Sequence, residues 1–167
     1  MKRIIASLAA IAMMAGAAPA FAGTSVTPAP SSFTLSGSVT VSQSVNLTCN
    51  LSLNVSVDSA GNAKITGGSL SAGNALCPSV VLTNFDWPIS ATAPSSPGAA
   101  TQLAIANFKA NTLTGNCAGT LTVAWNNSTK QATVASTVSG TSLGMSKPCT
   151  INGVLSSSNS SVSINVT

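Results

Sequence analysis

Apolar and polar residues alternate almost without interruption between residues 33 and 58. The odd positions are mostly apolar, and every even position from Thr34 to Asp58 is Ser, Thr, Asn or Asp. Successive side chains of a β-strand point to opposite faces, so this pattern predicts strands with one buried and one solvated face. A helix would instead place its apolar residues three and four positions apart.

The alternating run is too long for one ordinary strand, which has five or six residues. We expect a first break at Ser42-Gln43-Ser44, because Gln43 interrupts the apolar face. A second bend is expected near Cys49-Asn50. The residues that follow from Asp58 have the composition of a turn, so we expect the chain to reverse there.

Further strand signals follow along the chain. Residues 64–70 form a returning strand in which Gly67-Gly68 suggests a bulge or kink. Shorter strands are predicted at 80–82, 103–108 and 162–166. Residues 84–100 contain several prolines and predict a long irregular loop. The chain is therefore all-β, an antiparallel β-sandwich or open barrel of about eight to ten strands.

The N-terminal residues have the features of a secretory signal peptide. Lys2 and Arg3 precede an apolar segment, and Ala20-Phe21-Ala22 is a small-x-small cleavage site. We predict residues 1–22 as signal peptide, 23–32 as a flexible leader and 33–167 as a single β domain. The protein is then exported, to the periplasm at minimum and to the cell surface or medium beyond, with no membrane span after cleavage.

Charged residues are scarce beyond the signal peptide. Four lysines and two aspartates leave a net charge of +2. Scattered lysines without arginine do not form a nucleic-acid patch. A neutral surface rich in hydroxyl groups offers little electrostatic repulsion against self-association.

The missing residue types exclude most catalytic chemistry. Residues 23–167 contain no His, Glu, Arg or Tyr. A Ser-His-Asp or Cys-His site cannot be built without His, and general acid–base catalysis would rest on Asp and Lys alone. The cysteine spacing is too wide for a zinc site. We predict a protein that is not an enzyme, with no catalytic residues, cofactor or metal.

Four cysteines in an exported chain predict two disulfides, for which three pairings are possible. Cys49 and Cys117 each begin the pattern C-x3-L-x-V, followed by a turn and a returning strand. This similarity suggests two related halves, 33–100 and 101–167, although Thr/Val-rich strands can resemble one another by chance. Related halves favour the pairs Cys49–Cys77 and Cys117–Cys149.

Two features are candidates for function. Phe85, Trp87 and Pro88 could form an exposed apolar platform, or Trp87 could plug one end of the fold. The uncharged segments 33–41 and 162–166 could be edge strands that accept a strand from another molecule, or they could pair within the monomer.

The chain resembles the PraA/PraB group of secreted activators of alkane oxidation. The resemblance rests on SSFTLSGSVTVSQSVNLTCNL, the aromatic-proline segment NFDWPISA and GNCAGTLTVAWNN, and covers nearly all of the mature chain. It implies a secreted, non-catalytic accessory protein that promotes growth on hydrocarbons.

Two hypotheses for function follow. The first is an accessory protein of alkane utilisation that acts at the hydrocarbon–water interface or the cell surface. The second is a structural surface protein, a pilin-like or biofilm subunit that assembles by strand addition, as the segment GSVTVSQSVNLTCNL leading to a cysteine suggests. A second cysteine pair and the absence of tyrosine near the C-terminus count against a pilin.

Overall fold

The computed structural model describes residues 23–71 and 73–167. The predicted signal peptide lies outside these residues. Apart from a short 3₁₀ helix, η1 (Cys77–Ser79), the regular elements are strands. They are β1 (Thr24–Thr27), β2 (Ser31–Ser42), β3 (Asn46–Val57), β4 (Ala63–Ser71), β5 (Val81–Thr83), β6 (Trp87–Ala93), β7 (Gly98–Ala99), β8 (Gln102–Thr112), β9 (Gly115–Asn126), β10 (Gln131–Ser142), β11 (Met145–Ser146), β12 (Cys149–Ser157) and β13 (Ser163–Val166).

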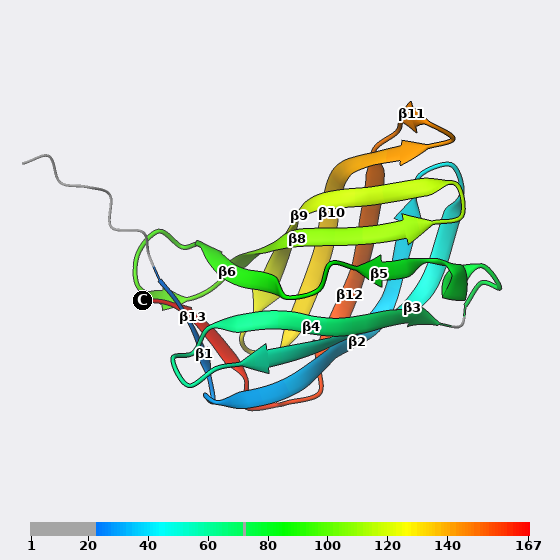
Figure 1. Ribbon diagram of the computed structural model, residues 1–167. Helices are drawn as coiled ribbons and strands as arrows, with labels where there is room; N and C mark the ends of the chain where they lie inside the picture. The colour runs from blue at the N-terminus through cyan, green and yellow to red at the C-terminus, as the bar shows by residue number, and fades with distance from the viewer. Residues whose placement is uncertain (1–22, 72) are drawn as a thin grey trace, which may run out of the picture.

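Eight of these strands form a closed antiparallel barrel (Figure 1). Pairing runs β2-β3-β4-β6-β8-β9-β10-β12 and returns from β12 to β2. The all-β prediction is confirmed: eight strands, within the predicted eight to ten, form a closed barrel, and five further short strands of the described residues lie outside this ring. The shortest junction is β4–β6, where only residues 63–65 pair with residues 87–89.

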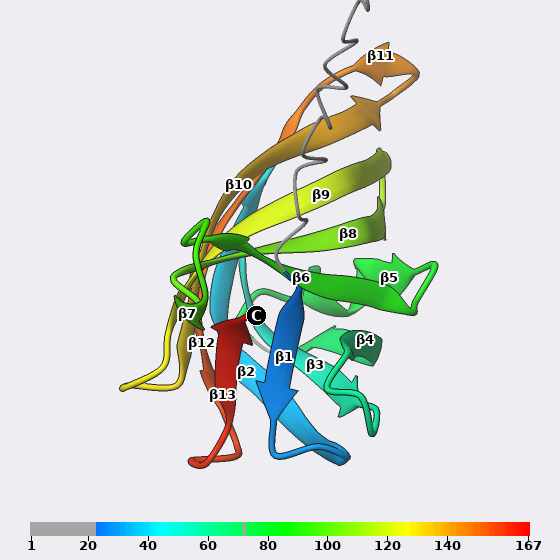
Figure 2. The same ribbon diagram turned by 90° about the vertical axis from the view of Figure 1, so that its left-hand side faces the viewer.

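A separate sheet covers one end of the barrel (Figure 2). Its strand order is β1-β13-β7, and Val26 on β1 and Val162 before β13 are fully buried. The prediction of a flexible leader at 23–32 was therefore wrong. Although short and rich in Gly and Pro, this segment contains Val26, whose burial against the barrel end fixes β1 in place.

The alternating pattern produces an apolar barrel interior and a polar outer wall. In β2, Leu35 and Val39 are buried whereas Ser36 and Ser38 are exposed. The predicted break at Gln43 is confirmed as the turn between β2 and β3. At Cys49-Asn50 the strand is not interrupted: β3 runs on to Val57, and the register shift of its ladder with β4 lies between Asn54 and Val55.

The predicted loop at 84–100 was wrong, because residues 87–93 form the barrel strand β6. Ile89 of this strand pairs with Ile105 of β8, and Pro88 pairs with Lys64 of β4. Proline usually marks a loop or a strand edge because it has no N–H to donate to a ladder. Here the brief β4–β6 junction accommodates it.

The favoured disulfide pairs are confirmed. Cys49–Cys77 has an S–S distance of 2.06 Å and Cys117–Cys149 one of 2.00 Å. The first bond joins β3 to η1, and the second joins β9 to β12 across the intervening β10. Both therefore fasten elements near the end of the barrel opposite the three-stranded sheet.

The two candidate edge strands, 33–41 and 162–166, do not lie at a sheet edge in the monomer. Strand β2, which contains 33–41, pairs with β3 on one side and β12 on the other. Strand β13 lies between β1 and β7. Both segments are thus already paired within the monomer, and neither offers a free ladder to another chain.

The β2–β12 junction predicts a sharp difference between two glycine substitutions. A Cβ on Gly37 would overlap the carbonyl oxygen of Val154 on β12, so we expect Gly37→Ala to lower the free energy of unfolding by about 1–3 kcal/mol. Gly67→Ala is the matched control, because its Cβ would meet only the side-chain amide of Asn54 at 3.4 Å. Urea denaturation measures both. Equal losses in the two variants would contradict the tight β2–β12 contact.

Candidate functional site: the apolar open end of the barrel

The barrel interior contains a small cavity with a wholly apolar lining. Its volume is ≈ 40 Å³, and its walls come from all eight barrel strands and from β5. Trp87 and Phe108 are its largest side chains, with ring centroids 5.1 Å apart in an edge-to-face arrangement. The centre of the molecule is thus a hydrophobic space that is not completely filled.

Trp87 belongs to this interior and not to the surface. Its side chain is 1% exposed, stacks on Phe85 with centroids 5.0 Å apart, and donates from Nε1 to the carbonyl oxygen of Thr83. Pro88 is exposed and Phe85 is half-buried. The three residues therefore do not form a shared exposed platform, because strand alternation directs Trp87 inward and Pro88 outward.

A second hollow opens at the barrel end opposite the three-stranded sheet. Its volume is ≈ 140 Å³, and it lies between the β2–β3 turn, the segment leading into η1 and the β8–β9 turn. Val41 and Val80 line both this hollow and the interior cavity. The hollow, called the mouth below, thus leads towards the barrel interior.

Five large apolar side chains at or beside loop tips surround this end of the barrel. We call them the apolar rim: Val45 (58% exposed), Leu76 (41%), Leu113 (66%), Leu143 (76%) and Met145 (66%). Exposed turns normally carry small or polar residues, so apolar side chains gathered at several loops of one end suggest contact with another apolar surface. Sequence reasoning missed them because each is a single residue within a polar turn.

Hydrogen bonds join the loops that carry the rim. Nε2 of Gln43 lies 3.2, 2.9 and 3.1 Å from the carbonyl oxygens of Asn116, Thr141 and Lys147. These carbonyls belong to β9, β10 and the segment before β12, so one side chain ties the β2–β3 turn across the barrel end. We call this set of contacts the Gln43 latch.

Two further contacts fasten the neighbouring turns. The hydroxyls of Ser44 and Ser142 lie 2.7 Å apart, and the Leu143 N–H donates to the carbonyl oxygen of Thr114 at 2.8 Å. Because Thr114 follows Leu113, the second bond places two rim residues, Leu113 and Leu143, on adjoining turns.

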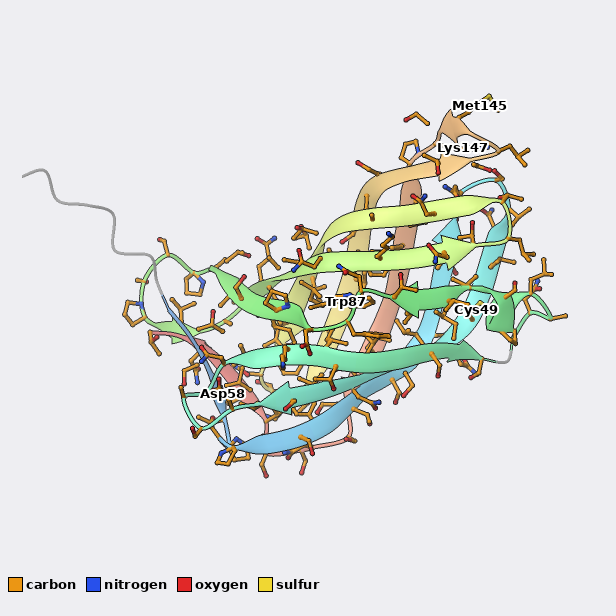
Figure 3. The ribbon with its side chains drawn as sticks, in the orientation of Figure 1. Cys49, Asp58, Trp87, Met145 and Lys147 are labelled. Atoms are coloured by element: carbon orange, nitrogen blue, oxygen red, sulfur yellow. A yellow bond between two sulfur atoms is a disulfide. The ribbon has the colours of Figure 1, made fainter. Side chains whose placement is uncertain are left out.

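Charged groups in the described residues lie mainly away from the rim. Figure 3 shows Asp58 at the barrel end remote from Met145, with Trp87 between them. Hydrogen bonds from the Asn62 side chain, and from the backbone of Asn62, Ala60 and Gly61, hold the pKa of Asp58 below its usual value. Lys64 and Asp86 form an exposed ion pair of 3.1 Å, a kind that adds little stability. Figure 3 also shows Lys147 beside Met145, so one lysine does lie at the rim.

The described residues contain no group of three or more His, Cys, Asp or Glu side chains arranged to hold a metal ion. None of their helices has the length and apolarity needed to cross a membrane.

The fold and this end define a class: a small, disulfide-bonded, closed β-barrel with an apolar interior and one apolar, open end. Residues 1–166 match the family described as "Alkane oxidation protein activator PraA/PraB-like". The chain belongs to this family, which confirms the resemblance noted from its sequence. No curated protein and no solved structure shows significant similarity to it.

The Gln43 latch generates a prediction about local stability. Gln43→Ala removes the bonds to three backbone carbonyls, so we expect the free energy of unfolding to fall by about 1–3 kcal/mol. Amide hydrogen exchange should accelerate in the β2–β3 and β10–β11 turns. Gln131→Ala is the matched control, because its amide makes one exposed contact of 3.5 Å with Ser156. Unchanged exchange at both turns in Gln43→Ala would contradict the latch.

Proposed function

We propose that this protein is an exported, non-enzymatic accessory factor that promotes alkane utilisation by adsorbing at hydrocarbon–water interfaces through its apolar rim. The observation that carries the proposal is the gathering of Val45, Leu76, Leu113, Leu143 and Met145 at one end of the barrel. Family membership supplies the link to alkane oxidation.

The physical basis of adsorption is hydrophobic transfer. Moving a fully exposed Leu or Met side chain from water into an apolar phase is favourable by about 1.5–3 kcal/mol. Several rim side chains can enter the hydrocarbon together, because they project from adjoining turns at the same end. The Gln43 latch and the Cys49–Cys77 bond hold these turns in place, so little conformational entropy is lost on contact.

The outer wall and the opposite end favour one orientation at the interface. Ser, Thr and Asn cover the wall along β2 and β3, and these side chains prefer water. The three-stranded sheet with its polar turns lies at the far end. The molecule is therefore an amphiphile along its barrel axis, with the rim facing hydrocarbon and the termini facing water.

The composition supports a role without catalysis. Beyond the signal peptide, side chains able to transfer protons near neutral pH are limited to two aspartates and four lysines, and the four cysteines are all paired. An activator that changes how hydrocarbon meets the cell needs no reacting groups. Two disulfides are also typical of proteins that fold in an oxidising compartment outside the cytoplasm.

Strand addition at the two segments considered for it, 33–41 and 162–166, is not available in the monomer, because β2 and β13 each have two neighbouring strands. We therefore favour the interfacial role, in which the cell surface or hydrocarbon is the partner.

Changing the rim tests the proposal. The double variant Leu143→Ser and Met145→Ser removes the two side chains most exposed on the β10–β11 turn. We expect a clear loss of surface activity, measured as a slower and smaller fall of hexadecane–water interfacial tension in a pendant drop. Folding should be preserved because neither side chain is buried.

The matched control is Val154→Ser, which removes an apolar side chain of 45% exposure from the barrel wall on β12. This variant should adsorb like the wild type. A double rim variant that lowers interfacial tension as fast and as far as the control would overturn adsorption through the rim.

A further inference from the structure

We propose that the barrel also binds single hydrocarbon molecules, taking the end of a neutral, unbranched alkyl chain through the mouth into the apolar interior. This inference rests on the proposed link to alkanes, but it assigns an internal binding site where the proposed function needs only surface adsorption. The protein would then carry dissolved alkane as well as coat its droplets.

The first argument is continuity between the two spaces. Val41 and Val80 line both the mouth and the interior cavity, and Val41 is only half-buried. An eight-stranded barrel is wide enough either to be filled by side chains or to hold one small ligand. Wholly apolar voids stay dry and accept apolar groups of matching size, and the ≈ 40 Å³ of the interior suits only the end of a chain whose remainder lies in the ≈ 140 Å³ mouth.

The second argument is the chemistry of the lining. The side chains that line the interior cavity, Leu35 and Leu155 among them, are apolar. Among the described residues, no charged side chain lines the cavity or the mouth. Polar side chains at the mouth already have partners: Gln43 Nε2 donates to the carbonyl oxygen of Thr141, and the hydroxyl of Ser44 bonds to that of Ser142. A carboxylate entering here would lose its hydration without gaining a cation, so the site favours an alkane over a fatty acid.

The third argument is a weak seam in the wall beside the mouth. Strand β4 pairs with β6 only at residues 63–65, and β5 pairs with β8 but not with β4. Between β4 and β5 the wall is closed by packed side chains, Leu70 and Leu82 among them, and the hydroxyl of Thr83 is buried there without a partner. Because a wall lacking ladder hydrogen bonds opens at lower cost, this seam can widen to admit a chain.

The two tryptophans provide a direct test in solution. Trp87 lines the interior cavity, whereas Trp125 hydrogen-bonds to Asn127 near β13 at the covered end. Oxidised protein comprising residues 23–167, labelled with ¹⁵N, is titrated with n-hexane kept below its solubility limit so that no interface is present. We expect the indole N–H signal of Trp87 to shift in a saturable manner and that of Trp125 to stay unchanged.

Two comparisons sharpen the test. Sodium hexanoate, which has the same chain length and a carboxylate, should shift Trp87 far less. Val41→Phe fills the passage between the two spaces and should weaken n-hexane binding by about tenfold or more, whereas Val41→Ala should retain it. An unchanged Trp125 signal verifies that each variant is folded.

The outcomes separate this inference from the proposed function. No shift of Trp87 up to saturation, or equal shifts of both tryptophans, would overturn the internal site, and equal binding by hexane and hexanoate would overturn its preference for a neutral chain. Undiminished binding by a folded Val41→Phe protein would overturn entry through the mouth. Pendant-drop adsorption by the wild type is measured independently, so the interfacial role can stand when the internal site fails.

Discussion

The pairing of β2 with β12 is the contact on which the rest of the structure depends, because it joins the first and last long strands and closes the barrel. Gly37 lies opposite Leu155 and Gly153 lies opposite Val39 in this ladder. A Cβ on Gly153 would overlap the carbonyl oxygen of Ser38, as one on Gly37 would overlap that of Val154. The missing side chains let the two backbones approach. Closure then leaves β2 with a partner on each side. It therefore has no free edge to which a strand of another chain could add.

The two ends of the closed barrel differ: one is covered by a sheet and the other is open. At one end β1, β13 and β7 form a sheet whose valines seal the core, and the backbone of Gly23 pairs with that of Thr167. At the other end no such sheet is present among the described residues, and turns fixed by Gln43 and by disulfides surround a hollow. Apolar side chains on these turns are costly in water, so the fold presents a surface that gains by meeting a nonpolar phase. A polar, weakly charged wall separates the two ends.

Much of the fold follows from residue order alone. The two-residue period at 33–58, the break at Gln43 and the cysteine pairs could be predicted because local alternation and the similarity of the two halves determine them. The β6 strand could not, since Pro88 and its neighbours have loop composition and only the brief pairing with β4 and β8 makes them a strand. Val26 was also missed, because its burial depends on contacts with residues near the other terminus.

The candidate site was less predictable than the fold. Trp87 is one of few aromatic residues in the sequence, but the alternation of β6 turns its side chain inward, and loop-like composition gives no indication of which way a side chain points. The rim residues are dispersed from Val45 to Met145, and only barrel closure brings them together. Gln43 could be recognised as an interruption of the apolar face. Its three carbonyl partners lie more than 70 residues along the chain, with separations of 73, 98 and 104.

The central claim is that the open end, and not the wall or the covered end, meets hydrocarbon. Hydrogen–deuterium exchange of the oxidised protein, free and adsorbed on hexadecane droplets, tests this most directly. The account predicts slower exchange on adsorption in the turns at 43–45, 113–114 and 143–146, with no change in the β3–β4 turn at 58–62. Slower exchange at 58–62 or along β1 and β13, with the rim turns unaffected, would contradict it.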